Sequence, residues 1–166
     1  MRKHSGFTTV ELLVVIALMA IIAVIAIPNF IGWLPNYRLR EATHDLYSNF
    51  QRAKLTAVKQ NTNCAVSFDG TGYMVFVDTD EDFVKDGGED EIAQVTWTDY
   101  KNISVTLADI TFDDTNTSGQ PSMAFRPNGL PTDGGGGFGN GTAPINNTNG
   151  KTYSVIVSQA GSIRIQ

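Results

Sequence analysis

The first thirty residues constrain the fold most, because they contain a long run without a polar side chain. Residues 12–27 are entirely apolar. As an α-helix, residues 7–27 would be about 30 Å long, which is the thickness of the hydrocarbon core of a bilayer. Basic residues lie at positions 2–4, and basic residues tend to stay on the cytoplasmic side. The sequence therefore predicts one membrane-spanning helix with the rest of the chain outside the cytoplasm.

The apolar run does not end like the signal peptide of an ordinary secreted protein. Such a signal needs a small-residue A-x-A cleavage site after the run, whereas this chain continues with Ile27-Pro28-Asn29-Phe30. Glu11 immediately precedes the run. A carboxylate at the edge of a spanning segment costs up to about a few kcal/mol unless it is paired or reaches the interface. We therefore expect an anchor that is not removed there, and a partner for Glu11.

The residues around the start of the run resemble a known family signature. Gly6-Phe7-Thr8-Thr9-Val10-Glu11, between a basic leader and an apolar run that ends at Pro28, is similar to the class III signal of type IV prepilins and type II secretion pseudopilins. The resemblance implies that a prepilin peptidase cuts between Gly6 and Phe7 and N-methylates Phe7. It also implies assembly into a helical filament, with Pro28 in the assembly helix and Glu11 paired to the terminal amine of a neighbouring subunit. The alternative is a plain membrane anchor whose Glu11 reaches the headgroups.

This interpretation divides the chain into three parts. Residues 1–6 form the leader peptide, residues 7–35 form the transmembrane and assembly helix, and residues 36–166 form a periplasmic pilin-like domain. Residues 28–35 contain two prolines and a glycine, and in a helix each proline costs about 3 kcal/mol and each glycine about 1 kcal/mol. We therefore expect a kink there and a segment that can extend on assembly. The alternative is a fixed bend at the membrane surface.

The pattern of apolar residues after the membrane run predicts an α+β domain. Residues 36–60 have helical spacing, with a stripe of apolar residues at Leu39, Ala42, Leu46, Phe50, Ala53 and Ala57. After Asn61 the apolar period changes to two, and Gly70-Thr71-Gly72 is typical of a tight hairpin. The predicted strands are 63–69, 73–78, 91–98, 103–107, 122–126, 153–158 and 162–165. The expected fold is one long N-terminal helix, transmembrane and then amphipathic, packed on an antiparallel β-sheet.

The C-terminal half contains a second resemblance. Phe125-Arg126-Pro127-Asn128-Gly129, then Tyr153–Ser158 and Gly161-Ser162-Ile163-Arg164, is similar to the closing pattern of the GspH/FimT group of minor pseudopilins and pilins. The resemblance implies an H-type minor pseudopilin of a type II secretion system. Its expected partners are other pilins or pseudopilins and an inner-membrane assembly platform. The alternative within filaments is a FimT-type minor pilin of a type IV pilus.

DNA binding is a third interpretation, from a different functional class. Some pilins of the GspH/FimT group end in a Gly-Arg-x-Arg motif implicated in DNA binding, but Ser162 replaces the first arginine here. Only Arg164 remains, with Arg126 and Lys151 as neighbours to consider, and the chain has 17 acidic against 12 basic side chains. An acidic balance does not favour capture of nucleic acid. A membrane-tethered DNA- or ligand-binding receptor is therefore the weaker hypothesis.

Two loops stand out between the predicted strands. The first places carboxylates at positions 1, 3, 5, 9 and 12 of a calcium-loop pattern: Asp78, Asp80, Asp82, Asp86 and Glu89. However, Phe83 occupies position 6, where an EF-hand needs glycine. We interpret this segment as a solvated hairpin loop, with calcium as the alternative and no other cofactor expected. The second loop, residues 127–150, is rich in Gly, Asn and Thr and is predicted to be a mobile surface excursion.

The motifs of the common enzyme classes are missing from the sequence. There is no G-x-S-x-G nucleophile motif, no H-E-x-x-H zinc motif and no P-loop. The two histidines, His4 and His44, do not accompany a nucleophile pattern. Cys64 is the one cysteine, so it cannot form a disulfide within the chain, and its apolar surroundings predict a buried thiol. We therefore expect a structural subunit without catalytic residues.

Overall fold

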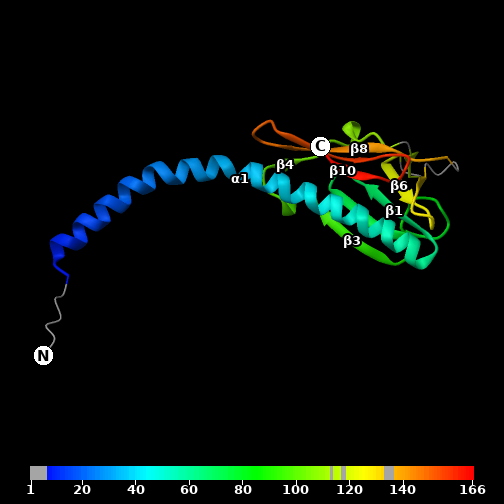
Figure 1. Cartoon of the computed structure of the whole chain (residues 1–166), viewed down its shortest axis with the longest axis horizontal. Coiled ribbons are helices and arrows are strands. Elements are labelled where there is room, and N and C mark those ends of the chain that lie inside the picture. The colour runs from blue at the N-terminus through cyan, green and yellow to red at the C-terminus, as the bar shows by residue number, and fades with distance from the viewer. Residues whose placement is uncertain (1–6, 113, 117–118, 133–136) are drawn as a thin grey trace, which may run out of the picture. The chain divides into compact units, whose positions relative to one another are not determined.

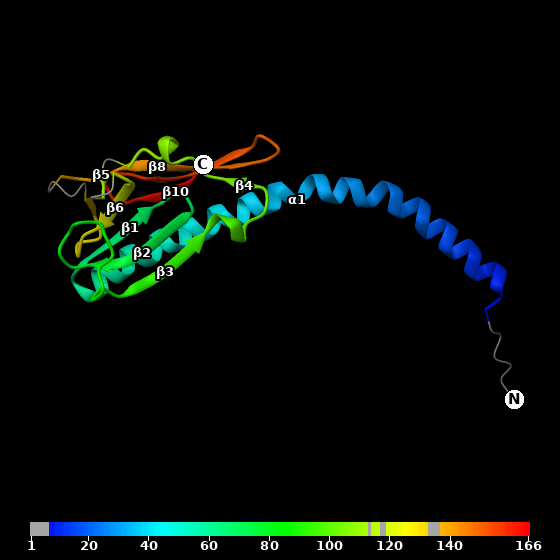
Figure 2. The same cartoon turned by 180° about the vertical axis from the view of Figure 1, so that it is seen from behind.

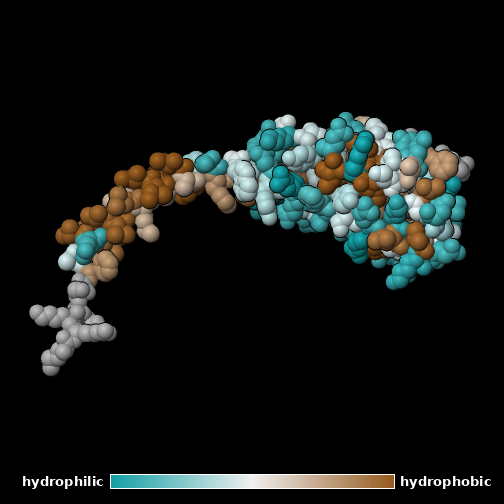
Figure 3. Space-filling model, viewed as in Figure 1, coloured by the Kyte–Doolittle hydropathy of each residue, from teal (hydrophilic) through white to brown (hydrophobic). Residues whose placement is uncertain are grey.

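The computed structural model describes residues 7–112, 114–116, 119–132 and 137–166. The chain divides into two compact units, Met1–Leu34 and Pro35–Gln166. One helix, α1 (Thr9–Gln60), continues from the first unit into the second. Among the described residues, α1 is the one helix with the length and composition needed to cross a membrane. Its first part appears as an apolar surface in the space-filling view (Figure 3).

The helix is continuous through Pro28, Gly32 and Pro35. The weakening that we predicted at these residues therefore does not interrupt the helix. A proline removes one backbone donor, and the hydrogen bonds of the adjacent turns are enough to carry the helix past it. Extension of residues 28–35 during assembly concerns the filament and stays a prediction.

The second unit combines the C-terminal half of α1 with two antiparallel sheets. Within the described residues, the first sheet has the order β3-β2-β1-β6-β5, with β7 also paired to β6, and the second has the order β10-β9-β8-β4. The strands of the first sheet are β1 (Asn63–Phe68), β2 (Gly72–Asp78), β3 (Glu91–Thr96), β5 (Asp114–Thr115), β6 (Pro121–Phe125) and β7 (Pro131–Thr132). Those of the second are β4 (Ile103–Ser104), β8 (Gly141–Asn147), β9 (Thr152–Val157) and β10 (Ile163–Ile165). Helix α1 lies along β1, β2 and β3 (Figures 1 and 2). This arrangement confirms the predicted α+β class.

One core joins the helix to both sheets. Phe50 of α1 is fully buried, and its ring lies 5.6 Å from that of Phe112 and 6.3 Å from those of Phe68 and Phe125. The predicted helical stripe faces this core, and alternate residues of β1 and β2 face it too. The second sheet contributes Ala143, Ile145, Val155, Val157 and Ile163. The apolar stripe of residues 36–60 is therefore core, as its spacing predicted.

The hairpin between β1 and β2 forms at the predicted glycines. Asp69 Oδ1 accepts hydrogen bonds from the backbone N–H groups of Thr71 and Gly72, at 2.7 and 2.6 Å. A Cβ atom on Gly72 would lie 1.9 Å from the backbone oxygen of Val95 in β3. The turn therefore requires the aspartate for its hydrogen bonds, and the close approach of β3 requires the glycine.

Two predicted strands are shorter in the structure than the sequence suggested. The strand predicted at 91–98 ends at Thr96, because Trp97–Asp99 forms the 3₁₀ turn η1. The strand predicted at 103–107 is reduced to Ile103–Ser104 and is followed by a second 3₁₀ turn, η2 (Leu107–Asp109). Apolar residues in these two turns contact the core without extending the sheets. The alternating apolar pattern did not distinguish the end of a strand from a 3₁₀ turn that follows it.

The prediction for residues 127–150 was wrong over much of its length. Residues Gly141–Asn147 form β8, which pairs with β9 from Gly141 to Asn146 and with β4 at Asn146 and Asn147. Ala143 and Ile145 of this strand are fully buried. Pro144 is tolerated because the described pairing of β4 reaches only Asn146 and Asn147. Ala143 and Ile145, at alternate positions, were too weak a signal to predict a strand among the neighbouring polar residues. Residues 133–136, which include most of the glycine run, lie outside the described residues.

The first sheet also has a second buried face. Ala65 of β1, Phe76 of β2 and Ala124 of β6 form a separate cluster with Phe83, which comes from the loop between β2 and β3. Phe83 is 4% exposed. This loop therefore folds back over the face of the sheet opposite α1, which explains why both faces of β1 are largely buried.

Candidate functional site

The start of α1 is a candidate assembly site, and Glu11 has a local partner there. The Glu11 Oε2 atom accepts hydrogen bonds from the backbone N–H of Thr8 at 3.1 Å and from its hydroxyl at 3.2 Å. In return, the Glu11 N–H donates to the Thr8 hydroxyl oxygen at 3.2 Å. This reciprocal pattern is a capping box, which satisfies free donors at a helix N-terminus. Gly6, the other predicted processing residue, lies outside the described residues, and Phe7 is exposed next to the cap.

The capping role of Glu11 was not predicted from the sequence, although a local signal for it exists. Thr8-x-x-Glu11 directly before an apolar run matches the [ST]-x-x-[DE] pattern of a capping box. A carboxylate in the first turn is also favoured by the helix dipole. Glu11 therefore stabilises the start of α1 in the single chain, in addition to any pairing it makes with another subunit.

The apolar residues of the first unit are exposed in the single chain. Every valine, leucine, isoleucine and methionine from Leu12 to Ile27 is exposed, and Pro28 lies at the end of this surface. A contiguous apolar surface of this kind is characteristic of a membrane or protein interaction site. The helix thus has the properties of a membrane anchor that can also pack against other helices.

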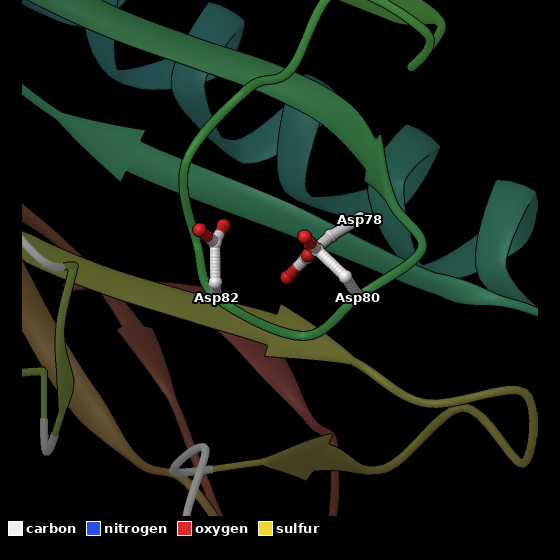
Figure 4. Close-up of side chains that lie close together, drawn as sticks. All are labelled: Asp78, Asp80 and Asp82. Atoms are coloured by element: carbon white, nitrogen blue, oxygen red, sulfur yellow. The ribbon is translucent and has the colours of Figure 1, made fainter.

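The loop between β2 and β3 brings together three of the five residues in the calcium-loop pattern. Carboxylate oxygens of Asp78, Asp80 and Asp82 all lie within 4.8 Å of one another. Figure 4 shows the three carboxyl groups on the same side of the loop ribbon, with those of Asp78 and Asp80 next to each other. Asp86 is not part of this group. Glu89 closes the loop: its Oε1 and Oε2 atoms accept hydrogen bonds from the N–H groups of Thr79 at 2.6 Å and Asp86 at 3.0 Å.

Asp78 differs from the other two aspartates because it is fully buried. Its Oδ1 atom accepts a hydrogen bond from the Glu81 N–H at 3.0 Å, but its Oδ2 atom has no hydrogen-bond partner among the described residues. Burial, with the nearby charge of Glu89, raises the pKa of the Asp78 carboxyl to about 6. The backbone N–H groups of Phe83 and Glu81 oppose that rise. The charged form of Asp78 is therefore poorly stabilised by the surrounding protein.

Three basic residues considered for DNA binding lie on different elements. Arg126, just after β6, donates from Nη2 to the Thr132 hydroxyl at 2.8 Å and to the Gly137 carbonyl at 3.1 Å. Lys151 is exposed at the turn between β8 and β9, and Arg164 is exposed on β10. Arg126 is thus used inside the fold. The expectation that nucleic acid is not a partner stays a prediction.

The C-terminal motif has a clear structural role. Gly161 adopts a φ of +74°, and a Cβ atom there would lie 2.8 Å from the Gly129 carbonyl oxygen. The Gly161 carbonyl in turn accepts a hydrogen bond from Lys54 Nζ of α1 at 2.7 Å. The Gly129 and Gly161 segments of the motif therefore meet beside Lys54 of the helix, and Gly161 forms part of the turn between β9 and β10.

We expect Gly161→Ala to destabilise the second unit by about 2–5 kcal/mol. A left-handed backbone costs an L-residue about 1–2 kcal/mol, and forcing a methyl group into a packed contact costs about 1–3 kcal/mol more. Gly150→Ala is the matched control, because Gly150 has a φ of +75° but nothing within 4 Å of an added Cβ. Denaturant unfolding of both variants measures the difference. Equal losses would show that the contact with Gly129 has no energetic role.

Cys64 is the free cysteine of the chain, and it lies buried in β1. Burial raises the pKa of its thiol to about 12, and the nearby Asp78 carboxylate acts in the same direction. A thiolate is the reactive form of cysteine. The residue therefore packs as a small apolar side chain, as the sequence predicted.

The chain matches two family models, one at each end. Residues 1–27 match the prokaryotic N-terminal methylation motif, and residues 42–161 match the model described as type II transport protein GspH. Among curated proteins, none matches the chain.

Two solved structures have a similar fold. The type IV minor pilin FimU of Pseudomonas aeruginosa has 19% sequence identity and a TM-score of 0.53, covering 79% of this chain and 90% of its own. The minor pseudopilin EpsH from the type 2 secretion system of Vibrio cholerae has 12% identity and a TM-score of 0.53, covering 78% of this chain and 96% of its own. At these identities the likeness concerns the fold.

Proposed function

Because the chain belongs to the GspH family of type II transport proteins and is a minor pseudopilin, we propose how its N-terminal segment is processed and assembled. A prepilin peptidase cuts between Gly6 and Phe7 and methylates the new amine of Phe7. The mature chain, held in the inner membrane by α1, then enters a helical pseudopilus with α1 in the filament core and the second unit outward. The exposed apolar surface of α1, with a carboxylate at its start, is the observation that carries this proposal.

The apolar surface explains why the chain needs first a bilayer and then other subunits. The valine, leucine, isoleucine and methionine side chains from Leu12 to Ile27 are exposed in the single chain, and exposed apolar area costs about 25 cal/mol per Å² relative to burial. Lipid tails cover this surface before assembly, and the helices of neighbouring subunits cover it afterwards. Moving the helix from one apolar environment to another hardly changes the free energy of burying its apolar surface. Specific contacts therefore decide whether a subunit joins the filament.

Glu11 supplies such a contact. In the single chain its carboxylate is held by Thr8 at the start of α1. After cleavage, the amine of Phe7 is a cation that stays charged when it carries one methyl group. In the low dielectric of a filament core, the Glu11 carboxylate of one subunit and the Phe7 amine of its neighbour attract each other strongly. The pair sets the axial register between subunits, and the capping box holds the carboxylate in place for it.

The second unit has the role of a structural module in this proposal. The family consists of structural pilin and pseudopilin subunits, and the second unit contains the C-terminal half of α1, both sheets and their shared core. The assembly platform in the inner membrane is the further partner that we propose.

The N-terminal mass of the protein recovered from its native membrane tests the processing step. We expect wild type to begin at methylated Phe7, and we expect Met1–Gly6 to remain attached in Gly6→Ala and in a peptidase-deficient strain. Gly32→Ala is the matched control, because an added Cβ at Gly32 meets nothing within 4 Å and the residue lies away from the cleavage site. It should be processed like wild type. Retention of residues 1–6 in wild type would overturn the proposal.

A further inference from the structure

We propose that the loop between β2 and β3 binds a calcium ion through the carboxylates of Asp78, Asp80 and Asp82. Their oxygens lie within 4.8 Å of one another at the end of β2, a separation that a cation bound to all three can bridge, since calcium–oxygen distances are 2.3–2.6 Å. All three carboxyl groups project to the same side of the loop (Figure 4). The site is independent of the processing and assembly of α1.

The buried carboxylate of Asp78 is the observation that distinguishes this cluster from an ordinary acidic loop. Asp78 is 0% exposed, and its Oδ2 atom is buried without a hydrogen-bond partner in the described part of the chain. Buried carboxylates are costly unless they are paired or coordinate a metal. Among the described residues, the charged groups acting on Asp78 are acidic, and Asp80 and Asp82 bring negative charge beside it. A bound cation would supply the counter-charge.

The donor set favours calcium over the other common metals. All three side chains offer hard carboxylate oxygens, and the group contains no histidine or cysteine, which zinc and copper prefer. Calcium accepts six to eight oxygens in a flexible geometry, whereas magnesium needs a near-ideal octahedron. Asp80 is exposed and Asp82 is half-buried, so water can complete the coordination. Such a partly open site is expected to have a dissociation constant on the order of 10⁻⁴–10⁻³ M, the range of extracellular calcium modules.

Ion binding to this loop would also stabilise the packing of Phe83 on the second face of the first sheet. Phe83 follows the three aspartates and packs on Ala65, Phe76 and Ala124. Glu81 and Phe83 have φ angles of +65° and +61°, which L-residues rarely adopt. Asp82 Oδ1 accepts a hydrogen bond from the Val84 N–H at 2.7 Å. An ion bound to Asp78, Asp80 and Asp82 would hold this turn and thereby keep Phe83 on the sheet.

Calcium titration of the full chain in detergent micelles, after treatment with EDTA, tests the proposal. We expect calorimetry to give one site, and calcium at ten times its dissociation constant to raise the melting temperature by about 3–5 °C. Asp80→Asn removes an exposed ligand without disturbing the core and should weaken binding by roughly tenfold or more. Asp78→Asn should abolish binding. The control Asp109→Asn removes the same charge from an exposed residue of η2 outside the loop and should bind like wild type.

Each outcome decides for or against the site. Binding by wild type and Asp109→Asn, together with its loss in the two loop variants, supports the proposal. The proposal is overturned if millimolar calcium produces neither heat nor a change in melting temperature in wild type, or if Asp80→Asn responds as wild type does. An equal response to magnesium at the same concentrations would overturn the assignment to calcium. Equal weakening in Asp109→Asn would show only a general charge effect.

Discussion

Replacing Phe50 with alanine is expected to lower the free energy of unfolding of the second unit by about 3–5 kcal/mol. Phe50 is fully buried in α1, and its ring contacts those of Phe68, Phe112 and Phe125 at centroid distances between 5.6 and 6.3 Å. The truncation would leave a cavity where the helix meets the first sheet. A loss of this size is a large part of the total stability of a typical domain, which is about 5–15 kcal/mol. Denaturant unfolding followed by near-ultraviolet circular dichroism measures it.

Leu55→Ala is the matched control for Phe50→Ala. Leu55 lies one and a half turns further along the same helix and is 67% exposed. Since alanine is also a good helix former, we expect a change within about 0.5 kcal/mol. If both variants lost the same stability, the assignment of the buried face of α1 would be wrong.

Replacing Glu11 with glutamine is expected to reduce incorporation into the filament by more than about a hundredfold. Leaving one charge of a buried pair without its partner costs about 3–5 kcal/mol, and each 1.4 kcal/mol corresponds to a factor of ten. Glutamine is also accepted at this position of a capping box, so the start of α1 should be retained. The measurement is the fraction of the protein in sheared filaments relative to the membrane, with insertion and cleavage as the reference.

Thr8→Ala separates the two roles of Glu11. This change removes the hydroxyl that bonds to Glu11 and accepts from its N–H, but it keeps the carboxylate. The cost of losing such a cap is about 1 kcal/mol, so we expect a loss of incorporation of less than about tenfold. A larger loss in Thr8→Ala than in Glu11→Gln would mean that capping, and not the charge, determines assembly.

Features that depend on local order along the chain could be predicted from the sequence. The apolar run from Leu12 to Ile27 requires an apolar environment whatever the rest of the fold, and the stripe around Phe50 follows from the helical period. The hairpin at Gly70-Thr71-Gly72 is likewise a local turn signal. These features, with the N-terminal signature, were sufficient for the α+β class and for the family, because residues close in sequence produce them.

Features that depend on residues far apart in the chain became visible only in the folded protein. Strand β8 is a strand because β9 and β4 pair with it, although its own sequence shows only a weak apolar alternation at Ala143 and Ile145. Gly161 cannot carry a side chain because the Gly129 carbonyl lies against it. Asp78 begins an acidic segment in the sequence, yet in the fold it is the last residue of β2, pairs with Asn63 of β1 and is fully buried. Burial and strand pairing are properties of the assembled fold, so the composition of a segment did not predict them.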